Sequence, residues 1–567
     1  MSLEIGELAE MLATIKSVFN LSGSPSENLL AFNWNRDGKW DVYIYDLSLE
    51  RIEKITSGPD SYLEPSFSNR RRLIAYLKDR EGDEMYQVIL RDLESGEEQD
   101  LTRDPSHYHF NPRFDPRDEM IAFTSNRGGR PSQLFLWRDH EILELTRWNE
   151  PIFNFNWVSE REIVYIRGIY DTELRLIDVE NLSDELLLKF EGSEIYLGDV
   201  NRSRKKILFT SNKNGYLDIG EYDLDERTWK WIYRSNSEKY SPRYYFDDIL
   251  FIEFTDGRNI LKKIRREEIE ILATGVVEFE VFRGGIAYVR STSDEPSSLY
   301  VNNKLVIDNT PGGLKGRLVK AYSDYYTTYD GRRIHAMIYK PDNWNKTAVV
   351  HVHGGPDAHS MDSWNPISQL LALNGFMVIQ PNYRGSTGFG REFQHLNDRD
   401  LGGGDLQDVI HAAKYAKDLG AEKIVIIGAS YGGYLTALAL VKAPEIWDAG
   451  VAIVGFYNWY TEYENEADYL KSYDSIKMDP KLFRERSPIF FVENIRAPVL
   501  FIHGEKDPRC PVEEVYQMIE VLNKLGKKVE HLIFPDEGHG VRKDENRIKM
   551  YKRIIEFLNK YLTGRVE

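Results

Sequence analysis

The stretch KIVIIGASYGGYLTALAL, residues 423–440, decides the fold of the C-terminal part of the chain. Its first six residues form an apolar run typical of a buried strand, and the residues after Ser430 have the composition of a helix. Between them, Gly428-Ala429-Ser430-Tyr431-Gly432 matches the pattern G-x-S-x-G, in which a tight strand-to-helix turn lifts the serine above a sheet. Small residues flank the serine because backbones approach closely in such a turn. Ser430 is therefore the candidate nucleophile.

Apolar runs that alternate with helical stretches surround this turn and predict an α/β domain. Helices are expected at residues 405–419, 432–442, 512–525 and 545–562. The expected strands are TAVVHVH at 347–353, FMVIQPN at 376–382, KIVIIG at 423–428, AGVAIV at 449–454, APVLFIHG at 497–504 and VEHLIFP at 529–535. This alternation predicts a doubly wound, mostly parallel sheet with helices on both faces.

A serine hydroxyl attacks efficiently when a histidine takes its proton and a carboxylate orients that histidine. On a doubly wound sheet the chain order is serine, acid, histidine, which leaves His531 and His539 as candidate bases. His539 follows the end of a strand, where catalytic groups collect, whereas His531 lies inside the strand and is interpreted as structural. We therefore predict His539 as the base and Asp507 as the acid, with Glu505 as the alternative acid and Asp536 as a turn residue.

An oxyanion site is predicted from two further positions. A tetrahedral intermediate needs preorganised N–H donors, usually the amide after the nucleophile and one from the loop after the third strand. Tyr431 supplies the first amide, and His353-Gly354-Gly355-Pro356 follows the strand TAVVHV, so Gly355 is expected to supply the second. His353 is then not a base, and the alternative reading of this segment is a plain tight turn.

The first half of the chain repeats one theme, an apolar strand followed by a polar turn and a second alternating strand. The strands open at Ala31, Ala75, Ala122, Val164, Leu208, Leu250 and Ala287. The first and last are 256 residues apart, so the repeat averages about 43 residues, the period of a four-stranded propeller blade. We predict a seven-bladed β-propeller, because radial stacking buries faces that one blade cannot bury alone. An eight-bladed ring, six blades with a stray hairpin and a β-solenoid are the alternatives.

Three segments follow from these patterns. Residues 1–20 carry Leu8, Met11, Leu12, Ile15, Val18 and Phe19 at helical spacing, which predicts an amphipathic packing helix. Residues 21–310 are assigned to the propeller. The turn-rich Asn309-Thr310-Pro311-Gly312-Gly313 ends the repeats, and residues 311–567 are assigned to the α/β domain.

Composition narrows the class of partner. The chain has 567 residues, and 73 basic against 91 acidic side chains give a net charge of −18, which disfavours nucleic acid and anionic membranes. The single cysteine, Cys510, rules out an intramolecular disulfide or a cysteine-based zinc site and favours the cytoplasm. The first 20 residues lack the uncharged core of a signal peptide. No metal or organic cofactor is expected, because Gly402-Gly403-Gly404 lacks the Lys-Ser/Thr of a phosphate loop.

The catalytic half resembles the prolyl oligopeptidase family of serine peptidases, and most closely its acylaminoacyl peptidase branch. The motifs that carry the resemblance are His353-Gly354-Gly355-Pro356, Pro381-Asn382-Tyr383-Arg384-Gly385-Ser386, Gly428-Ala429-Ser430-Tyr431-Gly432-Gly433-Tyr434 and Asp507-Pro508-Arg509-Cys510-Pro511. The resemblance implies an α/β-hydrolase domain on which the N-terminal helix packs, with the propeller inserted after that helix.

The resemblance also implies release of N-acylated amino acids from short blocked peptides, with the propeller as a size filter. It suggests that Arg509 reaches the substrate backbone and that Phe456, Tyr457 or Trp459 accommodate an apolar side chain; an ion pair and plain core packing are the respective alternatives. A carboxylesterase or a broader oligopeptidase would use the same triad. A propeller binding scaffold with an inactive hydrolase domain is a third possibility, and exposed edge strands would allow a homo-oligomer.

Overall fold

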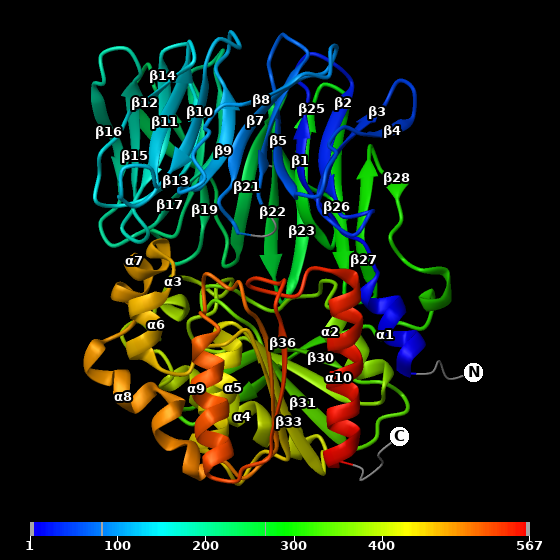
Figure 1. Ribbon diagram of the computed structural model, residues 1–567. Coiled ribbons are helices and arrows are strands. Elements are labelled where there is room, and N and C mark those ends of the chain that lie inside the picture. Colours follow the sequence, from blue (N-terminus) through cyan, green and yellow to red (C-terminus); the bar gives the residue numbers. More distant parts are fainter. Residues whose placement is uncertain (1–4, 81–82, 267, 563–567) are drawn as a thin grey trace. The chain divides into compact units, whose positions relative to one another are not determined.

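The computed structural model describes residues 5–80, 83–266 and 268–562 (Figure 1). These residues form two compact units. One unit comprises the described residues of 16–291 and 297–309, and the other comprises residues 5–15, 292–296 and 310–562. The first is all-β and the second is α/β, so the fold class predicted from the sequence is confirmed.

The all-β unit is a seven-bladed propeller of four-stranded antiparallel sheets, each built from four consecutive strands. Blades one to four are β1 (Val18–Gly23), β2 (Leu29–Trp34), β3 (Asp41–Asp46), β4 (Arg51–Lys54); β5 (Tyr62–Phe67), β6 (Leu73–Lys78), β7 (Gln87–Asp92), β8 (Glu98–Asp100); β9 (His109–Phe114), β10 (Ile121–Ser125), β11 (Gln133–Arg138), β12 (Glu141–Glu144); β13 (Ile152–Trp157), β14 (Glu162–Arg167), β15 (Glu173–Asp178), β16 (Asp184–Lys189). Blades five to seven are β17 (Ile195–Asn201), β18 (Lys206–Ser211), β19 (Asp218–Asp223), β20 (Thr228–Tyr233); β21 (Glu238–Tyr245), β22 (Asp248–Thr255), β23 (Arg258–Arg265), β24 (Glu268–Thr274); β25 (Val276–Phe282), β26 (Gly285–Thr292), β27 (Glu295–Val301), β28 (Lys304–Ile307).

The repeated sequence theme corresponds to the two middle strands of each blade. The seven openings lie in β2, β6, β10, β14, β18, β22 and β26, which are second strands. These strands are buried on both faces and therefore read as apolar runs, as the fully buried β10 shows. The fourth strands alternate between exposed and half-buried residues, as in β4, so their sequence signal is weak.

The ring closes by contact between β1 and β25 rather than by a shared blade. Each sheet holds strands that are consecutive in sequence, and the first blade packs against the last through these two innermost strands. The carboxylate of Glu278 in β25 accepts hydrogen bonds from the backbone N–H groups of Asn20 (2.8 Å) and Leu21 (2.6 Å) in β1. Gly23 allows this approach, since a Cβ there would lie 2.0 Å from Cβ of Phe282.

Aspartates at the ends of the third strands make turns in four of the blades. Asp46, Asp92, Asp178 and Asp223 each accept hydrogen bonds through Oδ1 from the backbone N–H groups two and three residues later. This is the Asx-turn geometry that lets an aspartate replace a backbone acceptor.

The α/β unit has one eight-stranded sheet of order β29-β30-β32-β31-β33-β34-β35-β36, parallel from β32 to β36. Its strands are β29 (Tyr322–Thr327), β30 (Arg333–Tyr339), β31 (Thr347–Val352), β32 (Met377–Pro381), β33 (Lys423–Ala429), β34 (Ala449–Ile453), β35 (Val499–Gly504) and β36 (Val529–Phe534). This is the mostly parallel sheet predicted from the alternation of strands and helices.

Helices cover both faces of this sheet. They are α1 (Ile5–Ala13), α2 (Pro366–Leu373), α3 (Arg391–Gln394), α4 (Gly404–Asp418), α5 (Tyr431–Lys442), α6 (Trp459–Asn465), α7 (Asp468–Lys477), α8 (Phe483–Arg486), α9 (Glu513–Lys524) and α10 (Asp544–Leu562), with 3-10 turns at Gly312–Leu314, Pro480–Leu482 and Pro488–Asn494. Ile424 and Ile426 of β33 face the core that contains α4, α5 and α9, whereas Val425 and Ile427 face α1, α2 and α10. The four helices expected from the sequence agree with α4, α5, α9 and α10 to within one residue.

The N-terminal helix is shorter than the sequence pattern suggests. The expectation of a helix over residues 1–20 is wrong at its C-terminal end: α1 ends at Ala13, and Val18 and Phe19 belong to β1. Leu8 and Leu12 do form the buried face of α1, which packs against α10. The helical spacing continues by coincidence, because pairing of Val18 with Trp34 in the first blade outweighs local helix propensity.

No helix within residues 5–80, 83–266 and 268–562 combines the length and the apolar character needed to cross a membrane.

Candidate active site

Ser430 lies at the turn between β33 and α5, in a strained backbone conformation. Its φ and ψ angles are 56° and −126°, a region that residues with a side chain rarely adopt. A Cβ on Gly428 would lie 2.3 Å from the Gly432 oxygen, and one on Gly432 would lie 2.2 Å from the Val352 oxygen. Both glycines are therefore required by the close approach of the turn to β31, as the G-x-S-x-G motif predicts.

The structure brings the three predicted catalytic side chains together. The Oγ atom of Ser430 lies 3.1 Å from Nε2 of His539. The Nδ1 atom of the same ring lies 3.0 and 2.9 Å from the two carboxylate oxygens of Asp507. Ser430, His539 and Asp507 follow β33, β36 and β35, so all three stand at the carboxyl ends of parallel strands.

The carboxylate of Asp507 is held by its own loop. Its Oδ1 atom accepts hydrogen bonds from the backbone N–H groups of Arg509 (2.9 Å) and Cys510 (3.0 Å), and the residue is 6% exposed. His503, fully buried at the end of β35, lies 2.8 Å through Nε2 from the Cys510 carbonyl oxygen. Nε2–H donates to that carbonyl oxygen, which can only accept, and burial lowers the pKa of His503. The sequence interpretation did not assign this role to His503.

The other candidate acids and the other candidate base have different surroundings. Glu505 accepts a hydrogen bond from the hydroxyl of Tyr516 at 3.1 Å. His531 is exposed on β36, where it pairs with Phe501 of β35. Asp536 pairs with Lys543, which lowers the pKa of that aspartate.

The loop that carries His539 is anchored by Glu537, which the sequence interpretation missed. Glu537 is 3% exposed, and its carboxylate accepts hydrogen bonds from the backbone N–H groups of Arg542 (2.9 Å) and Lys543 (3.0 Å) and from Asn546 Nδ2 (2.8 Å). The backbone of this loop crosses Gly504, where a Cβ would lie 2.4 Å from the Glu537 oxygen. The loops of Asp507 and His539 are thereby held against each other.

The loop His353-Gly354-Gly355-Pro356 lies against the turn of Ser430. A Cβ on Gly354 would lie 3.0 Å from the Ala429 oxygen and 3.2 Å from Cβ of Ser430. Gly355 has a φ of 122°, which favours glycine. Tyr431 is the first residue of α5, so its backbone N–H has no acceptor within the helix.

His353 is engaged away from Ser430. Its ring nitrogens lie 2.7 Å from the Gly354 carbonyl oxygen and 2.9 Å from the Ser386 hydroxyl, and its ring stacks on Tyr383 at 4.2 Å between centroids. Burial lowers the pKa of His353 to about 3, so the ring is neutral at physiological pH. Tyr383, which lies in the Pro381–Ser386 motif, also donates its hydroxyl to the His353 carbonyl oxygen at 2.9 Å.

Buried polar contacts support the nucleophile turn from α4. The Tyr431 hydroxyl donates to Asp405 at 2.6 Å, and burial raises the pKa of Asp405 to about 6. Arg384 forms a bidentate pair with the buried Asp408, with Nε and Nη2 each 2.8 Å from a carboxylate oxygen. These contacts fix the Pro381–Ser386 segment and the residue after Ser430 on one helix.

The predicted substrate-contacting residues are three aromatic residues of the core and one partly buried arginine. Phe456, Tyr457 and Trp459 are 6%, 0% and 1% exposed and belong to the core of the α/β unit. Phe456 stacks on Tyr434 at 4.6 Å between ring centroids. Arg509 is partly buried, and its backbone N–H binds Asp507. The structure thus gives Tyr457 and Trp459 a packing role.

An α/β-hydrolase sheet that carries a serine, a histidine and an aspartate in this geometry defines the class of serine hydrolases. Residues 362–565 match the sequence model described as the prolyl oligopeptidase family. The hydrolase part of this chain is thus similar to that family, in agreement with the resemblance seen in its motifs.

Three comparisons show how far the likeness extends. The chain is 27% identical over 441 residues to dipeptidyl peptidase family member 6 of Caenorhabditis elegans, an alignment of 74% of this chain and 55% of that protein. A puromycin-hydrolyzing peptidase of Mycobacterium tuberculosis superimposes with a TM-score of 0.85 at 17% identity, covering 98% and 96% of the two chains. Pyrococcus horikoshii acylaminoacyl peptidase superimposes with a TM-score of 0.74 at 20% identity, covering 99% and 98%. The alignments span about half the length of the curated relatives.

Proposed function

We propose that this protein is a serine peptidase that cleaves short peptides through an acyl-enzyme. The observation that carries the proposal is the continuous chain of contacts from Ser430 Oγ to His539 and on to Asp507. The family of residues 362–565 supports peptide substrates, because peptide hydrolysis is what its description names.

In this mechanism His539 acts first as base and then as acid. Its Nε2 atom takes the proton of Ser430 as Oγ attacks the scissile carbonyl carbon, and Asp507 holds the Nδ1–H and stabilises the imidazolium. The backbone amides of Tyr431 and Gly355 are assigned to the oxyanion. His539 then protonates the leaving amine, and a water molecule activated by the same ring releases the acyl group from Ser430.

For specificity, we propose release of an N-acylated amino acid from the blocked end of a short peptide. The H-G-G-P form of the oxyanion loop and the family resemblance support this choice, and the solved acylaminoacyl peptidase shares the fold. Arg509, adjacent to the acid, is proposed to bind the substrate backbone, and Phe456, next to Tyr434, to contact an apolar side chain. A limit on substrate size is attributed to the propeller, and a cytoplasmic location stays a prediction.

The second candidate is a dipeptidyl peptidase that requires a free amino terminus. It is favoured by the curated relatives, several of which are named dipeptidyl peptidases. A carboxylesterase is the third, because the triad cleaves esters more readily than amides.

One digestion experiment separates these candidates. Acetyl-Ala-Ala-Ala-Phe, the same peptide with a free amine, an ester of acetylalanine and one unfolded protein are incubated with the protein, and the products are identified by mass spectrometry. We expect acetylalanine from the blocked peptide and no cleavage of the unfolded protein. Release of Ala-Ala from the free-amine peptide would support the dipeptidyl peptidase, and turnover of the ester alone would support the esterase.

Ser430→Ala is the control for this experiment. It is expected to abolish every product, whichever substrate is preferred, because all three candidates use the same nucleophile. A product that persists in the variant would contradict the proposed role of Ser430.

A further inference from the structure

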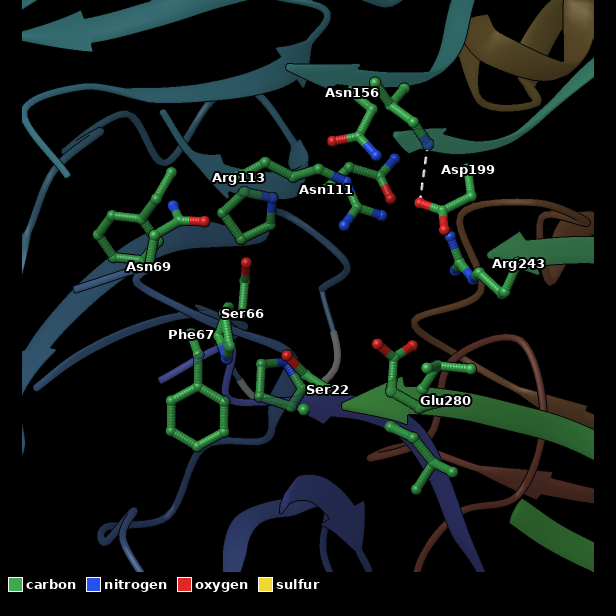
Figure 2. A pocket seen from close by; sticks show the side chains of 18 of the residues that line it. Ser22, Ser66, Phe67, Asn69, Asn111, Arg113, Asn156, Asp199, Arg243 and Glu280 are labelled. Carbon is green, nitrogen blue, oxygen red and sulfur yellow. Dashed lines mark hydrogen bonds between the residues drawn. The ribbon is translucent and has the colours of Figure 1, made fainter. Parts of the chain in front are cut away.

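Every blade of the propeller contributes at least one residue of its innermost strand to a cavity of about 660 Å³, and seven of these residues, one from each blade, form a set (Figure 2). In chain order these residues are Ser22, Ser66, Arg113, Asn156, Val200, Arg243 and Glu280. In five of the seven strands the residue comes directly after a β-bulge, so the backbone aims it the same way in each blade. The repeats LEPSF at 63–67, FNPRF at 110–114 and YSPRY at 240–244 are the sequence trace of this position.

Two of the seven side chains are arginines that have no carboxylate partner within the described part of the chain. Among the described residues, no acidic oxygen lies within 4.0 Å of either guanidinium, and the Nε atoms of Arg113 and Arg243 are buried without a hydrogen-bond partner. Figure 2 shows both side chains directed into the same space. Burial and the charge of Arg243 both lower the pKa of Arg113, so the two like charges act on each other across the cavity.

Three of the four acids around the cavity are already used by the backbone. Glu64 accepts from the Asn111 N–H at 2.8 Å, and Asp199 accepts from the N–H groups of Val200 and Tyr244 at 2.8 and 3.0 Å. Glu278 closes the ring through Asn20 and Leu21. The carboxylates of these three acids already accept hydrogen bonds from backbone N–H groups of the blades. Fewer of their lone pairs are therefore left to pair with the arginines.

The fourth acid, Glu280, does not pair with either arginine within 4.0 Å among the described residues, although its charge raises the pKa of Arg243. Glu280 lines the cavity from β25 of the seventh blade, the blade that follows the one carrying Arg243. Burial raises the pKa of Glu280 to about 7. A carboxyl group that is half protonated near neutral pH neutralises less than one positive charge and offers a hydrogen-bond donor as well as an acceptor.

We propose that this cavity binds the C-terminal carboxylate of a short peptide, held between Arg113 and Arg243. A planar guanidinium matches a carboxylate in a bidentate geometry, and the ligand supplies the direct carboxylate contact that neither arginine has among the described residues. The amide side chains of Asn111 and Asn156 and the hydroxyls of Ser22 and Ser66 line the same cavity and match the polar groups of a peptide backbone. The proposal rests on the propeller alone and goes beyond the proposed function.

A peptide fits this cavity better than a phosphate does. Its volume of about 660 Å³ lies in the range of sites for ligands of several residues or drug-like size and is much larger than an inorganic anion needs. The acids of the wall repel any anion in proportion to its charge, so a doubly charged phosphate is repelled more strongly than a single carboxylate.

The test uses the full chain with Ser430→Ala, so that peptides bind without turnover. Isothermal titration compares acetyl-Ala-Ala-Ala with its C-terminal amide, which differs only in the carboxylate. We expect the acid to bind at least tenfold more tightly than the amide. Arg113→Gln and Arg243→Gln should each remove this preference, and bound acid should protect residues 109–114 and 238–245 from hydrogen exchange.

Arg204→Gln, at an exposed propeller arginine that pairs with Asp247, is the matched control and should keep the preference. Arg113→Lys retains the charge without the planar fork and should show a reduced preference, which keeps the test decisive if Arg113→Gln folds poorly. Equal binding of acid and amide would overturn the proposal. A preference unchanged by the Arg113 and Arg243 variants, or stronger binding of inorganic phosphate than of the peptide, would overturn it too.

Discussion

At the scale of single residues, the turn that carries the nucleophile holds Ser430 in a strained backbone conformation that positions its hydroxyl. Ser430 keeps a φ of 56°, and Gly428 and Gly432 leave room for the backbones that press on it. A serine in this conformation costs of order 1–3 kcal/mol that a glycine would not incur. The packing of α5 and β31 around the turn maintains this strained conformation.

This strain predicts the ranking of two inactive variants. Ser430→Gly relaxes the backbone, although the greater freedom of glycine in the unfolded chain offsets part of the gain. We expect Ser430→Gly to exceed Ser430→Ala in unfolding free energy by about 1 kcal/mol. Thermal unfolding of the two variants side by side checks this, and an alanine variant at least as stable as the glycine variant would contradict it.

The choice of acid is tested by a pair of neighbouring carboxylates. Asp507→Asn should lower kcat/KM by roughly 10³- to 10⁴-fold, because His539 loses the partner that fixes its tautomer and stabilises its charge. Glu505→Gln is the matched control and should stay within about threefold of the parent, because Glu505 faces Tyr516. Steady-state kinetics and the rate of fluorophosphonate labelling of Ser430 give two readouts. A large loss in Glu505→Gln would reverse the assignment.

The sequence was sufficient to single out Ser430, His539 and Asp507, which the structure brings into contact, because each follows a strand with a clear apolar run. The residues that support them were not predictable in the same way. Glu537 and His503 act through backbone groups that come close only when β35 and β36 pair, and nothing in their local sequence distinguishes them from ordinary loop and strand residues.

At the scale of elements, predictability follows burial. Strands such as β2 and β10 that are buried on both faces were found from their apolar runs, whereas the innermost strands were not, because they carry polar residues toward a cavity. The same effect misplaced Val18 and Phe19, whose spacing continues that of α1 although they belong to β1. Tertiary pairing decides such cases.

The innermost strand β9 predicts a pH dependence. His109 is fully buried against Phe123, and its ring nitrogens lack partners among the described residues. Burial, assisted by the charge of Arg127, lowers the pKa of His109 to about 3, against about 6.5 in the unfolded chain. Between these values the unfolded chain binds a proton that the folded chain does not, so stability falls as the pH drops below 6.5.

His109→Leu should remove this loss. The difference in propeller unfolding free energy between pH 7 and pH 5 should shrink by roughly 2 kcal/mol, because the variant has no proton to take up at this position. Denaturant unfolding at both pH values measures it, with the exposed His140→Gln as control. An unchanged difference in His109→Leu would show that other groups govern the acid response.

At the scale of the whole molecule, the architecture could be predicted from the sequence more fully than the details. Seven repeats of about 43 residues predicted seven blades, and the structure excludes the eight-bladed, six-bladed and solenoid alternatives. The sixth and seventh units, whose repeats are weakest, form complete sheets of long strands. Their stability comes from packing on neighbours, which tolerates drift in sequence.

Because the two units have separate cores, a destabilising substitution in one unit should leave hydrogen exchange in the other unchanged. Leu12→Ala opens a cavity between α1 and α10 and should cost about 2–4 kcal/mol, with faster hydrogen exchange in residues 544–562. Glu278→Ala leaves the N–H groups of Asn20 and Leu21 without their acceptor and should speed exchange in residues 18–23. Exchange measured by mass spectrometry should rise in one unit at a time.

Glu268→Ala, at an exposed position of β24, is the control for the propeller variant and should leave exchange in β1 unchanged. Faster exchange in α10 on Glu278→Ala would contradict the separation of the two cores.

The docking of α1 on α10 has a consequence for the order in which the chain becomes structured during translation. The Ala13 carbonyl oxygen accepts a hydrogen bond from Nε of Arg547 at 2.9 Å, although 534 positions separate the two residues. The ribosome emits α1 first of the described helices and α10 last, and every blade of the propeller leaves the exit tunnel in between. The apolar face of α1 therefore cannot pack on α10 until most of the described chain has been synthesised. Until then, chaperones or the ribosome surface are available to bind this face.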